Sequence, residues 1–392
     1  MSTIPEEIYL EILYRVPVET IGVRKCVCKY WLSLISSPDF VKIHLNHTIK
    51  KNNPTLLLQY HDYDKKCGAT YSISYDLLSS SMNDFEDNAV NIRCPLVSCV
   101  SLGTCDGLVC CLVYECSYRG VLFRWNPTTQ EYKLLPVSPN ESSVGKEIGI
   151  CGFGYDHKIN DYKVVKLLQY IRDVEHIYPI DRADPSKGMS AVDVYTMGSN
   201  SWKSIESVPY SFTISGVSGV LVNGALHWLG HTQALHRSLV VVSLNVSEER
   251  FEEMELPKQP YEKNNKFMTV GALEGFLRVI VNVDNTRVEV WKMREYGVQE
   301  SWNICHVVTN KIIVNDSYLK LVWFRNGEIL FKIPCDLVFY EQKHGTAVEP
   351  NIRGSLLLIT EDIYFESLVS VDSGTYVEPY RGSLCREAGL CC

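Results

Sequence analysis

The sequence predicts a mostly β protein with a small N-terminal α domain: a three-helix unit followed by a six-bladed β-propeller-like domain. Three observations predict this architecture. Apolar residues recur at helical spacing up to about residue 45. From about residue 55 they fall instead in short alternating or fully apolar strands that are separated by turn residues. One strand–turn–strand element then recurs at the interval that is typical of propeller blades.

The N-terminal region contains the signals of three short helices. The first begins at a capping-box pattern, Thr3–Glu6, with Pro5 near the first helical position, where a missing N–H costs nothing. Pro17 ends this helix because proline disfavours α geometry in the residue before it. Two more short helices are expected, one over residues 18–23 and one from about Val27 to Ile35, which Pro38 closes.

These helices carry more apolar residues than a unit of about 45 residues can cover by itself. Apolar helix faces that stay open indicate a partner that buries them. The alternative is that all of these residues belong to the ordinary core of one domain. The positions that we expect the helices to leave uncovered are Ile4, Ile8, Leu13, Val16 and Ile21.

The recurring element of the β region is a β-branched run that ends in an aromatic residue or leucine, followed by a polar turn and a second strand. Successive marker residues are separated by 50, 70, 49, 47 and 48 residues. Four of these five intervals match the period of about 40–50 residues of propeller blades. The long interval contains a polar stretch, 170–190, which we interpret as an insertion loop. The markers are Tyr75, Trp125, Tyr195, Leu244, Trp291 and Phe339.

Apolar hairpins are expected between the markers, and several have turn residues such as Asn-Gly at their tips. A sixth hairpin, 356–371, follows the last marker, whereas the first marker has no full hairpin before it. The simplest assembly places the last strands in the same blade as the first, which leaves no sheet edge open. The spacing does not fix the count of six to better than one blade. The expected hairpins are 107–113, 161–168, 217–228, 276–283 and 320–331.

Composition and charge exclude several classes of protein. A formal charge of −8 is unsuited to non-specific nucleic-acid binding, which needs a basic surface. The sequence has no run of about 18 apolar residues, so a membrane-spanning helix is not expected. The first residues lack the basic and apolar regions of a signal peptide. Because neither a membrane span nor a signal peptide is expected, we expect the protein in the cytoplasm or the nucleus, where its 15 cysteines, an odd number, would be small apolar core residues.

The patterns that could indicate a metal, a cofactor or catalysis are weak. The cysteines between residues 94 and 116 lack a paired C-x₂-C spacing, and Cys110-Cys111 should point to opposite faces of a strand. His227, His231 and His236 are not on an expected helix. The glycines from Gly149 to Gly154 have the wrong spacing for a dinucleotide loop, and we expect them to allow close strand packing within a blade. We therefore predict neither catalytic residues, nor a metal, nor a cofactor.

The polar stretch Arg172–Lys187 is long for a turn and has two interpretations. It is either a solvated loop or a blade insertion that contacts a substrate. Its charged candidates are Arg172, Asp173, Glu175, Asp181 and Asp184. Residues 372–392 are expected to form a flexible tail. The tail ends in Cys391-Cys392, but Gly389 stands where a prenylation box would need its cysteine.

The order of motifs along the chain resembles plant F-box proteins that carry an F-box-associated domain. Ile4 and Val16 stand where leucine is usual in that family, and Cys28 where serine is usual. The motifs that carry the F-box resemblance are Ile4-Pro5-Glu6-Glu7-Ile8, Glu11-Ile12-Leu13, Arg15-Val16-Pro17-Val18, Cys26-Val27-Cys28-Lys29, Trp31 and Leu34–Pro38. Those of the associated domain include Cys105–Cys110, Trp125-Asn126-Pro127, Gly152–Asp156, Val222–Trp228 and Trp291–Val298 with Trp302.

The resemblance implies an F-box over residues 1–48 and a kelch-like recognition domain over 55–371. It further implies a non-catalytic adaptor: a Skp1-like protein would bind the F-box and link it to cullin and RING subunits, and the β domain would bind a protein substrate for ubiquitination and degradation. Among such relatives we lean towards a role in plant defence. The Skp1-facing residues would be Ile4, Pro5, Ile8, Leu13, Val16, Pro17 and Ile21, with Trp31 and Ile35 packing the helices together. The alternative is a propeller-type small-molecule-binding protein, such as a lectin, or an enzyme.

Overall fold

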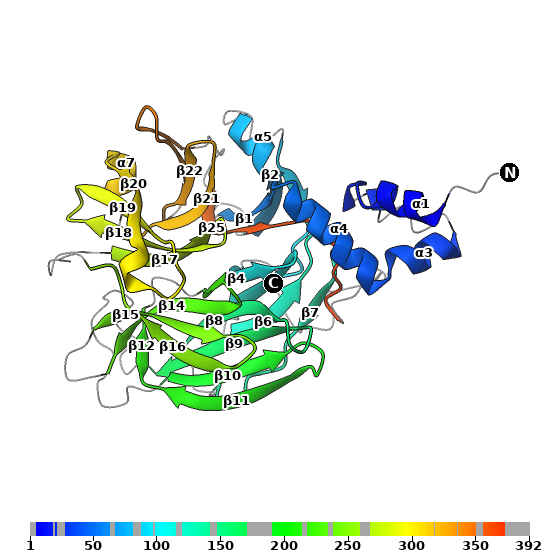
Figure 1. The fold of residues 1–392 in the computed structure, drawn as a ribbon, viewed down its shortest axis with the longest axis horizontal. Coiled ribbons are helices and arrows are strands. Elements are labelled where there is room, and N and C mark those ends of the chain that lie inside the picture. Colours follow the sequence, from blue (N-terminus) through cyan, green and yellow to red (C-terminus); the bar gives the residue numbers. More distant parts are fainter. Residues whose placement is uncertain are drawn as a thin grey trace.

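A computed structural model gives the fold of the chain (Figure 1). The structure describes residues 5–18, 20–21, 28–62, 67–80, 88–96, 99–114, 120–141, 147–170, 190–213, 218–233, 238–258, 267–316, 318–334, 336–349 and 356–372. The predicted tail, 372–392, therefore lies outside the described residues except for Asp372, and Ile4 and the polar stretch 171–189 lie outside them as well.

Six antiparallel sheets form the blades of a β-propeller. Blade I contains β25 (Leu356–Tyr364), β1 (Thr55–Asp62), β2 (Cys67–Ser74) and β3 (Val90–Ile92). Blade II contains β4 (Val100–Cys105), β5 (Leu108–Tyr114), β6 (Gly120–Trp125) and β7 (Tyr132–Leu134). Blade III contains β8 (Glu147–Asp156), β9 (Asp161–Tyr170), β10 (Ser190–Thr196) and β11 (Ser201–Val208).

The other three blades follow in chain order. Blade IV contains β12 (Tyr210–Phe212), β13 (Val220–Val222), β14 (Ala225–Thr232), β15 (Leu239–Asn245) and β16 (Arg250–Met254). Blade V contains β17 (Phe267–Leu273), β18 (Phe276–Val283), β19 (Arg287–Met293) and β20 (Trp302–Val308). Blade VI contains β21 (Lys320–Arg325), β22 (Glu328–Lys332), β23 (Leu337–Glu341) and β24 (Thr346–Val348). Between the strands lie α5 (Tyr75–Ser80), η2 (Gln299–Ser301) and α7 (Lys311–Val314).

The propeller closes by pairing the end of the chain with its beginning. Strand β25 pairs antiparallel with β1, with Leu58 opposite Glu361. This confirms the predicted joining of the last strand to the first blade, and it pairs β1 on both sides, with β25 and with β2. The expected final hairpin, 356–371, is wrong: only 356–364 form a strand, and 365–372 run on without strand structure. The latter segment packs against blade II and the N-terminal helices instead.

The repeat is largely confirmed. Five of the six markers lie on the third strand of a blade, and Tyr75 directly follows β2, the third strand of blade I. The segments 107–113, 161–168 and 276–283 are single second strands rather than hairpins, because in each case the polar turn stands before the segment. The expected turn residues Asn160, Asn223 and Asn326 adopt positive φ values of 52°, 50° and 54°. This left-handed conformation suits the tight turns of hairpins.

The bounds of the N-terminal helices differ from those expected: the first helix ends at Leu13, before Pro17, and a longer helix follows the one that ends at Ile35. Helix α1 spans Glu6–Leu13, with Pro5 at its N-cap, and α3 spans Lys29–Ile35. Pro38 does not simply close α3 but begins a longer helix, α4 (Pro38–Lys50), because proline is well suited to the first turn of a helix. The Ser37 hydroxyl caps α4 by accepting a hydrogen bond from Phe40 N at 3.3 Å. None of the described helices is long and apolar enough to cross a membrane.

A shared apolar cluster joins the helices to the propeller. It contains Leu13, Ile35 and Phe40 from the helices together with residues of blades II and III, such as Leu108 and Phe153. Three side chains of the segment after β25 belong to the same cluster: Leu368, Val369 and Val371. In Figure 1 this segment runs beside the helices, at the right-hand side of the propeller. The helical unit is therefore docked on the propeller rather than connected only through the chain.

Candidate functional site

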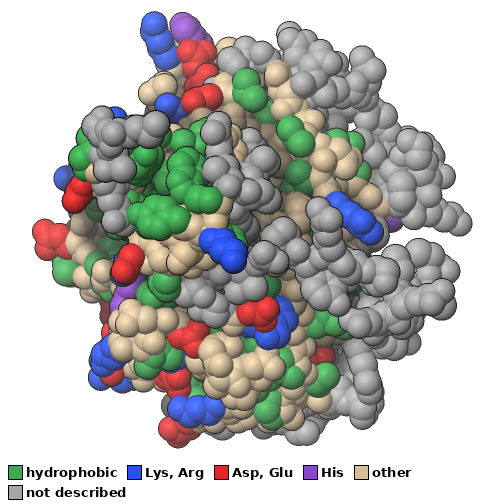
Figure 2. Space-filling view, turned by 90° about the vertical axis from the view of Figure 1, so that its right-hand side faces the viewer, with side chains coloured by type: hydrophobic (Ala, Val, Ile, Leu, Met, Phe, Trp, Pro, Cys, Tyr) green, Lys and Arg blue, Asp and Glu red, His purple; other side chains and the backbone are tan. Residues whose placement is uncertain are grey.

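An apolar helical face lies at the N-terminal end of the molecule. Ile8 and Ile12, one turn apart on α1, have exposed fractions of 50% and 54%. Residues four apart occupy the same face of a helix. Tyr30 on α3 is also half exposed. Figure 2, which faces this end of the molecule, shows hydrophobic side chains gathered in a patch. We refer to Ile8, Ile12 and Tyr30 as the helical face.

The seven residues expected on a partner-binding surface do not all lie there. Ile8, Pro5 and Pro17 are exposed, and Val16 is partly buried. Leu13 and Ile21 are buried, with exposed fractions of 2% and 0%. The expectation that these two remain uncovered is wrong, because they belong to an apolar cluster that also contains residues of α4 and of the propeller. Ile4 lies outside the described residues. Ile35 is fully buried and Trp31 is partly buried in the same cluster, as expected of residues that pack the helices together.

A buried histidine fixes α4 against the end of the first helix. His44 Nε2 lies 2.9 Å from the carbonyl oxygen of Val16, to which the neutral ring donates a hydrogen bond. Its ring also stacks on Phe40, with ring centroids 5.9 Å apart. Burial lowers the pKa of His44 below its ordinary value and outweighs the hydrogen bond to Val16, which raises it. His44 therefore favours the uncharged state, in which it holds the two helical segments together.

The segment after β25 is held by an asparagine of blade II. Asn126 Nδ2 donates hydrogen bonds to the carbonyls of Ser367 and Val369 at 3.1 and 2.7 Å. Gly107 lets the same segment approach closely: a Cβ on Gly107 would lie 2.3 Å from Ser367 Oγ, and its φ is +83°. We call residues 365–372 the strap, because they lie between the helices and the propeller. The strap adds fixed contacts to the junction of the two units.

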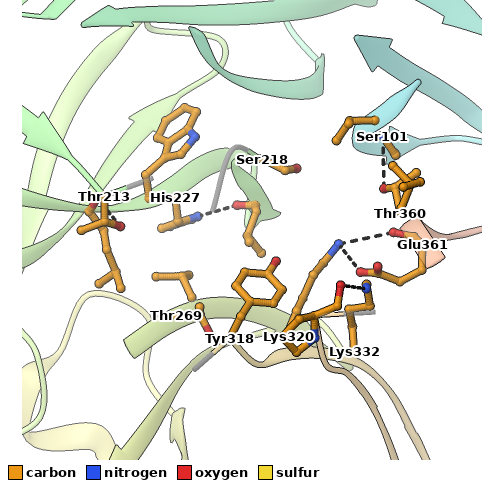
Figure 3. Close-up of a pocket in the computed structure, with 17 residues that line it drawn as sticks. Ser101, Thr213, Ser218, His227, Thr269, Tyr318, Lys320, Lys332, Thr360 and Glu361 are labelled. Atoms are coloured by element: carbon orange, nitrogen blue, oxygen red, sulfur yellow. Dashed lines mark hydrogen bonds and ion pairs between the residues drawn. The ribbon is translucent and has the colours of Figure 1, made fainter. Parts of the chain in front are cut away.

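A cavity of about 200 Å³ lies on the propeller axis (Figure 3). Its wall comes from blades I, II, IV, V and VI, so only the closed ring assembles it. The apolar part includes Val220, Trp228 and Val270. The polar part that Figure 3 labels consists of Ser101, Thr213, Ser218, His227, Thr269, Tyr318, Lys320, Lys332, Thr360 and Glu361.

An ion pair forms one side of the cavity. Lys320 Nζ lies 3.1 Å from Glu361 Oε1, and the Lys320 side chain is 32% exposed whereas that of Glu361 is 4% exposed. The Lys320 side chain is thus the more accessible of the two. Burial opposes the charge of Lys320, but Glu361 and Asp362 outweigh it and raise the pKa of the lysine above its ordinary value. Lys332 donates to the carbonyls of Ile333, Pro334 and Leu358 at 2.7, 2.9 and 3.2 Å.

His227 lies in the cavity wall as a neutral ring. Its Nδ1 is 3.0 Å from the carbonyl of Val220 and its Nε2 is 2.8 Å from the Tyr296 hydroxyl. An imidazole that donates from Nδ1 and accepts at Nε2 satisfies both contacts. Burial lowers the pKa of His227 to about 4. Of the three histidines weighed in the sequence, His236 lies outside the described residues, and His227 is engaged with Tyr296 and the backbone.

The helices and the cavity lie at opposite ends of β4. The turn after β4 is at the helical end, where Gly107 contacts the strap and Lys42 of α4 acts electrostatically on Asp106. Ser101, at the start of β4, lines the cavity. A strand of this length spans on the order of 20 Å. The two candidate surfaces are therefore separated along the propeller.

The predicted substrate loop leaves the propeller at the cavity end. Gln169, near the end of β9, exchanges two hydrogen bonds with the backbone of Phe212: Nε2 donates at 3.1 Å and Oε1 accepts at 2.8 Å. The next residue, Thr213, lines the cavity. The candidate residues of the loop, Arg172 to Asp184, lie outside the described residues, so their contacts with a substrate stay a prediction.

The cysteines and glycines singled out in the sequence pack within the core of the propeller. Cys110 and Cys111 are buried in different apolar clusters, as the alternation of a strand predicts. Burial is the main cause that raises the pKa of the Cys111 thiol. Within the described part of the chain, no group of three or more His, Cys, Asp or Glu side chains is arranged to hold a metal ion. A Cβ on Gly152 would lie 2.8 Å from Trp228, so this glycine permits packing between blades III and IV, not within one blade as expected.

Sequence reasoning missed the cavity residues, although a signal for them exists. Lys320 interrupts an otherwise apolar run, Leu319 to Val322, and Glu361 follows the apolar start of β25. Charged residues rarely stand in buried strands unless they are paired. Lys320 and Glu361 lie on the first strands of two blades. Because the first strands of all blades face the propeller axis, the two charges could have been predicted to pair there.

These features together define a six-bladed β-propeller protein that carries a docked N-terminal helical module. The model of the F-box associated β-propeller domain matches residues 64–373. The chain belongs to the plant F-box proteins with an F-box associated β-propeller domain, which confirms the family resemblance of the sequence motifs.

Relatives from Arabidopsis thaliana match across most of their length. The F-box/kelch-repeat protein At3g23880 is 28% identical over 84% of this chain and 87% of its own. F-box protein CPR1 is 29% identical over 82% of this chain and 76% of its own, and F-box protein At5g49610 is 30% identical over 79% and 80%. Among solved structures, TolB from Acinetobacter baumannii aligns at 7% identity with a TM-score of 0.42, over 82% of this chain and 73% of its own.

Proposed function

We propose that this protein is the substrate-recognition adaptor of a Skp1–cullin–F-box ubiquitin ligase. The helical module would bind a Skp1-like protein, and through it cullin and RING subunits, while the propeller would bind a protein substrate for ubiquitination and degradation. The chain would then act without a catalytic site of its own, in the cytoplasm or the nucleus. Membership of the F-box family supports this role.

The single observation that carries the proposal is the helical face. Ile8 and Ile12, on one face of α1, remain half exposed, whereas Leu13, Ile35 and Phe40 of the same helical unit are buried in the cluster that it shares with the propeller. Complete burial of an aliphatic side chain contributes about 1.5–3 kcal/mol, and each isoleucine is already half buried, so covering both would favour association by about 1.5–3 kcal/mol in total before association costs are subtracted. The separation of this face from the cavity would also leave the far end of the propeller accessible to a substrate.

The test is co-purification of the full chain with a Skp1-like protein. The double substitution Ile8→Asp with Ile12→Asp should reduce the amount of bound Skp1-like protein more than tenfold. Val137→Asp is the matched control, because Val137 is exposed but lies on the propeller after β7. Both variants should unfold at the urea concentration of the wild type. Equal recovery of the Skp1-like protein by the double variant and the wild type would contradict the adaptor role.

Substrate capture is tested separately under proteasome inhibition. The double variant should lose cullin and RING subunits but retain proteins that bind the propeller. The expected substrates meet two conditions. They co-purify with both the wild type and the double variant, and they accumulate in cells that express only the double variant. If every co-purifying protein is lost together with the Skp1-like protein, the propeller has not been shown to bind a substrate, and this half of the proposal fails.

A propeller that binds a small molecule is the second candidate function. The observation that favours it is the axial cavity. Its volume of about 200 Å³ is smaller than the 300–1,000 Å³ of pockets for drug-sized ligands, so only a very small ligand would fit. A cavity of this size suits one side chain or a very small metabolite. Retention of small-molecule binding by a chain that fails to bind a Skp1-like protein would favour this function over the adaptor role.

A further inference from the structure

The axial cavity contains hydroxyl groups whose hydrogens are already engaged. Ser218 Oγ donates to the carbonyl of Leu102 at 2.6 Å, and Thr269 Oγ1 donates to the carbonyl of Leu319 at 2.8 Å. Ser101 Oγ donates to Asp362 Oδ2 at 2.6 Å. A hydroxyl has one hydrogen to donate and two lone pairs that accept. Towards a ligand, these hydroxyl groups are therefore acceptors.

Lys320 supplies the complementary donor. An ammonium has three N–H groups, and two of them are directed at Glu361, towards Oε1 at 3.1 Å and the backbone carbonyl at 3.5 Å. The third is available to the cavity, on the side where the Lys320 side chain is accessible. Figure 3 shows the Lys320 ammonium and the Glu361 carboxylate pointing towards each other at one side of the cavity. Lys332, by contrast, directs its ammonium at three carbonyls.

The charges around the cavity balance. Lys320 and Lys332 are the cationic side chains of the wall, and Glu361 is the anionic one. Asp362 stands directly behind the Ser101 hydroxyl and contributes a second negative charge. A charged ligand of either sign would meet like charge here. An anionic ligand would face the carboxylates of Glu361 and Asp362, and a cationic ligand would face the ammonium groups of Lys320 and Lys332.

We propose that the axial cavity binds a primary carboxamide on a short apolar stem, supplied by a glutamine or asparagine side chain of a bound polypeptide. The carboxamide oxygen accepts from Lys320, and its NH₂ group donates to the oxygens of Ser218 and Thr269. The stem packs on Val220 and Val270. A neutral group with two donors and one acceptor leaves the Lys320–Glu361 pair intact. The choice of a polypeptide source rests on the proposed function, whereas the carboxamide chemistry rests on the cavity alone.

The test is saturation-transfer NMR on the purified full chain with three blocked amino acids of similar size. The probes are the N-acetyl methylamides of glutamine, glutamate and methionine at pH 7. The glutamine probe should bind at least tenfold more tightly than the other two. Lys320→Met and Thr269→Val should each weaken its binding at least tenfold. The matched exposed controls, Lys311→Met on α7 and Thr286→Val in the β18–β19 turn, should leave it unchanged.

The outcomes separate the proposal from its rivals. Equal or tighter binding of the glutamate probe would overturn the carboxamide assignment, and so would binding of the glutamine probe that neither cavity variant weakens. Lack of binding of any probe to the folded chain would overturn the site itself. Free glutamine is measured alongside the three probes, and a tenfold preference for it over the blocked form would overturn the polypeptide source. If Lys320→Met does not fold because Glu361 is left buried and unpaired, the near-isosteric Thr269→Val decides alone.

This experiment contains no Skp1-like protein, so it fails or succeeds independently of the adaptor role. Binding of the glutamine probe without co-purification of a Skp1-like protein would support the carboxamide site and contradict the adaptor role. Binding of the Skp1-like protein through the helical face without the expected probe selectivity would support the adaptor role and contradict the carboxamide site.

Discussion

The side-chain amide of Asn126 donates a 2.7 Å hydrogen bond to the carbonyl of Val369, and this contact ties blade II to the strap. Asn126 is fully buried, and its Oδ1 accepts from the backbone N–H groups of Thr128 and Thr129 at 2.9 and 3.2 Å. The same residue thus shapes the turn after β6 and holds the strap on which the helical module rests.

Asn126→Ala should lower the free energy of unfolding by about 2–4 kcal/mol, because it leaves buried backbone groups on both sides without a partner. Urea denaturation measures this change. Asn303→Ala is the control: Asn303 donates to the carbonyls of Lys292 and Ser301 at 3.2 and 3.3 Å but is only partly buried. It should cost about 1 kcal/mol or less. Equal costs for the two substitutions would show that the strap contact contributes nothing.

Truncation after Tyr364 should loosen the helical module while the propeller stays closed. The truncation removes Leu368, Val369 and Val371 from the cluster that α4 shares with blades II and III, but it leaves the β25–β1 pairing in place. Hydrogen–deuterium exchange should therefore become faster in α4 and remain unchanged in β18. Faster exchange throughout the propeller would show instead that the strap is needed for closure of the ring.

Stability should fall as the pH is lowered through the titration range of His227. The folded-state pKa of about 4 lies below the ordinary 6.5, so below pH 6.5 the unfolded chain binds the proton more readily than the folded one. The neutral His227 ring contributes fully to the free energy of unfolding above pH 6.5, and this contribution is lost progressively towards pH 4. The loss between pH 7.5 and pH 5 is about 2 kcal/mol.

The measurement is urea unfolding of the wild type and of His227→Phe at both pH values. The loss between pH 7.5 and 5 should be smaller in the variant by about 2 kcal/mol. His44, whose pKa is also lowered by burial, adds a loss in the same direction, but it is present in both proteins and cancels in the comparison. The same loss of stability in both proteins would show that His227 is not held neutral in the folded chain.

The blades were predictable because each one repeats a local pattern. Markers such as Trp125 and Trp291 occupy the equivalent third strand, and a period of about 48 residues is visible in one sequence. The pairing of the last strand with the first blade was predictable because strands remained after the last marker, whereas the first marker had no full hairpin before it. Helix α4 was missed because a proline such as Pro38 can either follow the end of one helix or lie in the first turn of the next. The Ser37 N-cap, which indicates the second arrangement, is a weak local signal.

The cavity was not predictable, because its parts meet only when the ring closes. Lys320 and Glu361 are 41 residues apart, and Ser218 is a further hundred residues from Lys320 in the chain. Leu13 and Ile21 likewise belong to a cluster that includes residues of blades II and III, which the helical periodicity does not contain. Periodicity identifies which side of an element is apolar, but it does not identify what covers that side.

The contact between Gly219 and Trp228 gives a final test of how the cavity wall is built. Gly219 N donates to the carbonyl of Cys151 at 2.6 Å, and Trp228 Nε1 donates to the same carbonyl at 3.2 Å, so blades III and IV meet at this point. A Cβ on Gly219 would lie 2.5 Å from the Trp228 ring. The ring is buried and has little room to move away.

Gly219→Ala should therefore destabilise the chain by about 1–3 kcal/mol, the usual cost of overpacking a core. Gly271→Ala on β17 should have a neutral or slightly stabilising effect, because its Cβ would meet its nearest neighbours, Leu321 and Ile280, at 3.7 and 3.8 Å. Urea denaturation measures both changes. Displacement of Trp228 also predicts weaker binding of the glutamine probe in the Gly219 variant alone. If the two substitutions shift the unfolding midpoint equally, Trp228 is free to move and does not form a fixed wall of the cavity.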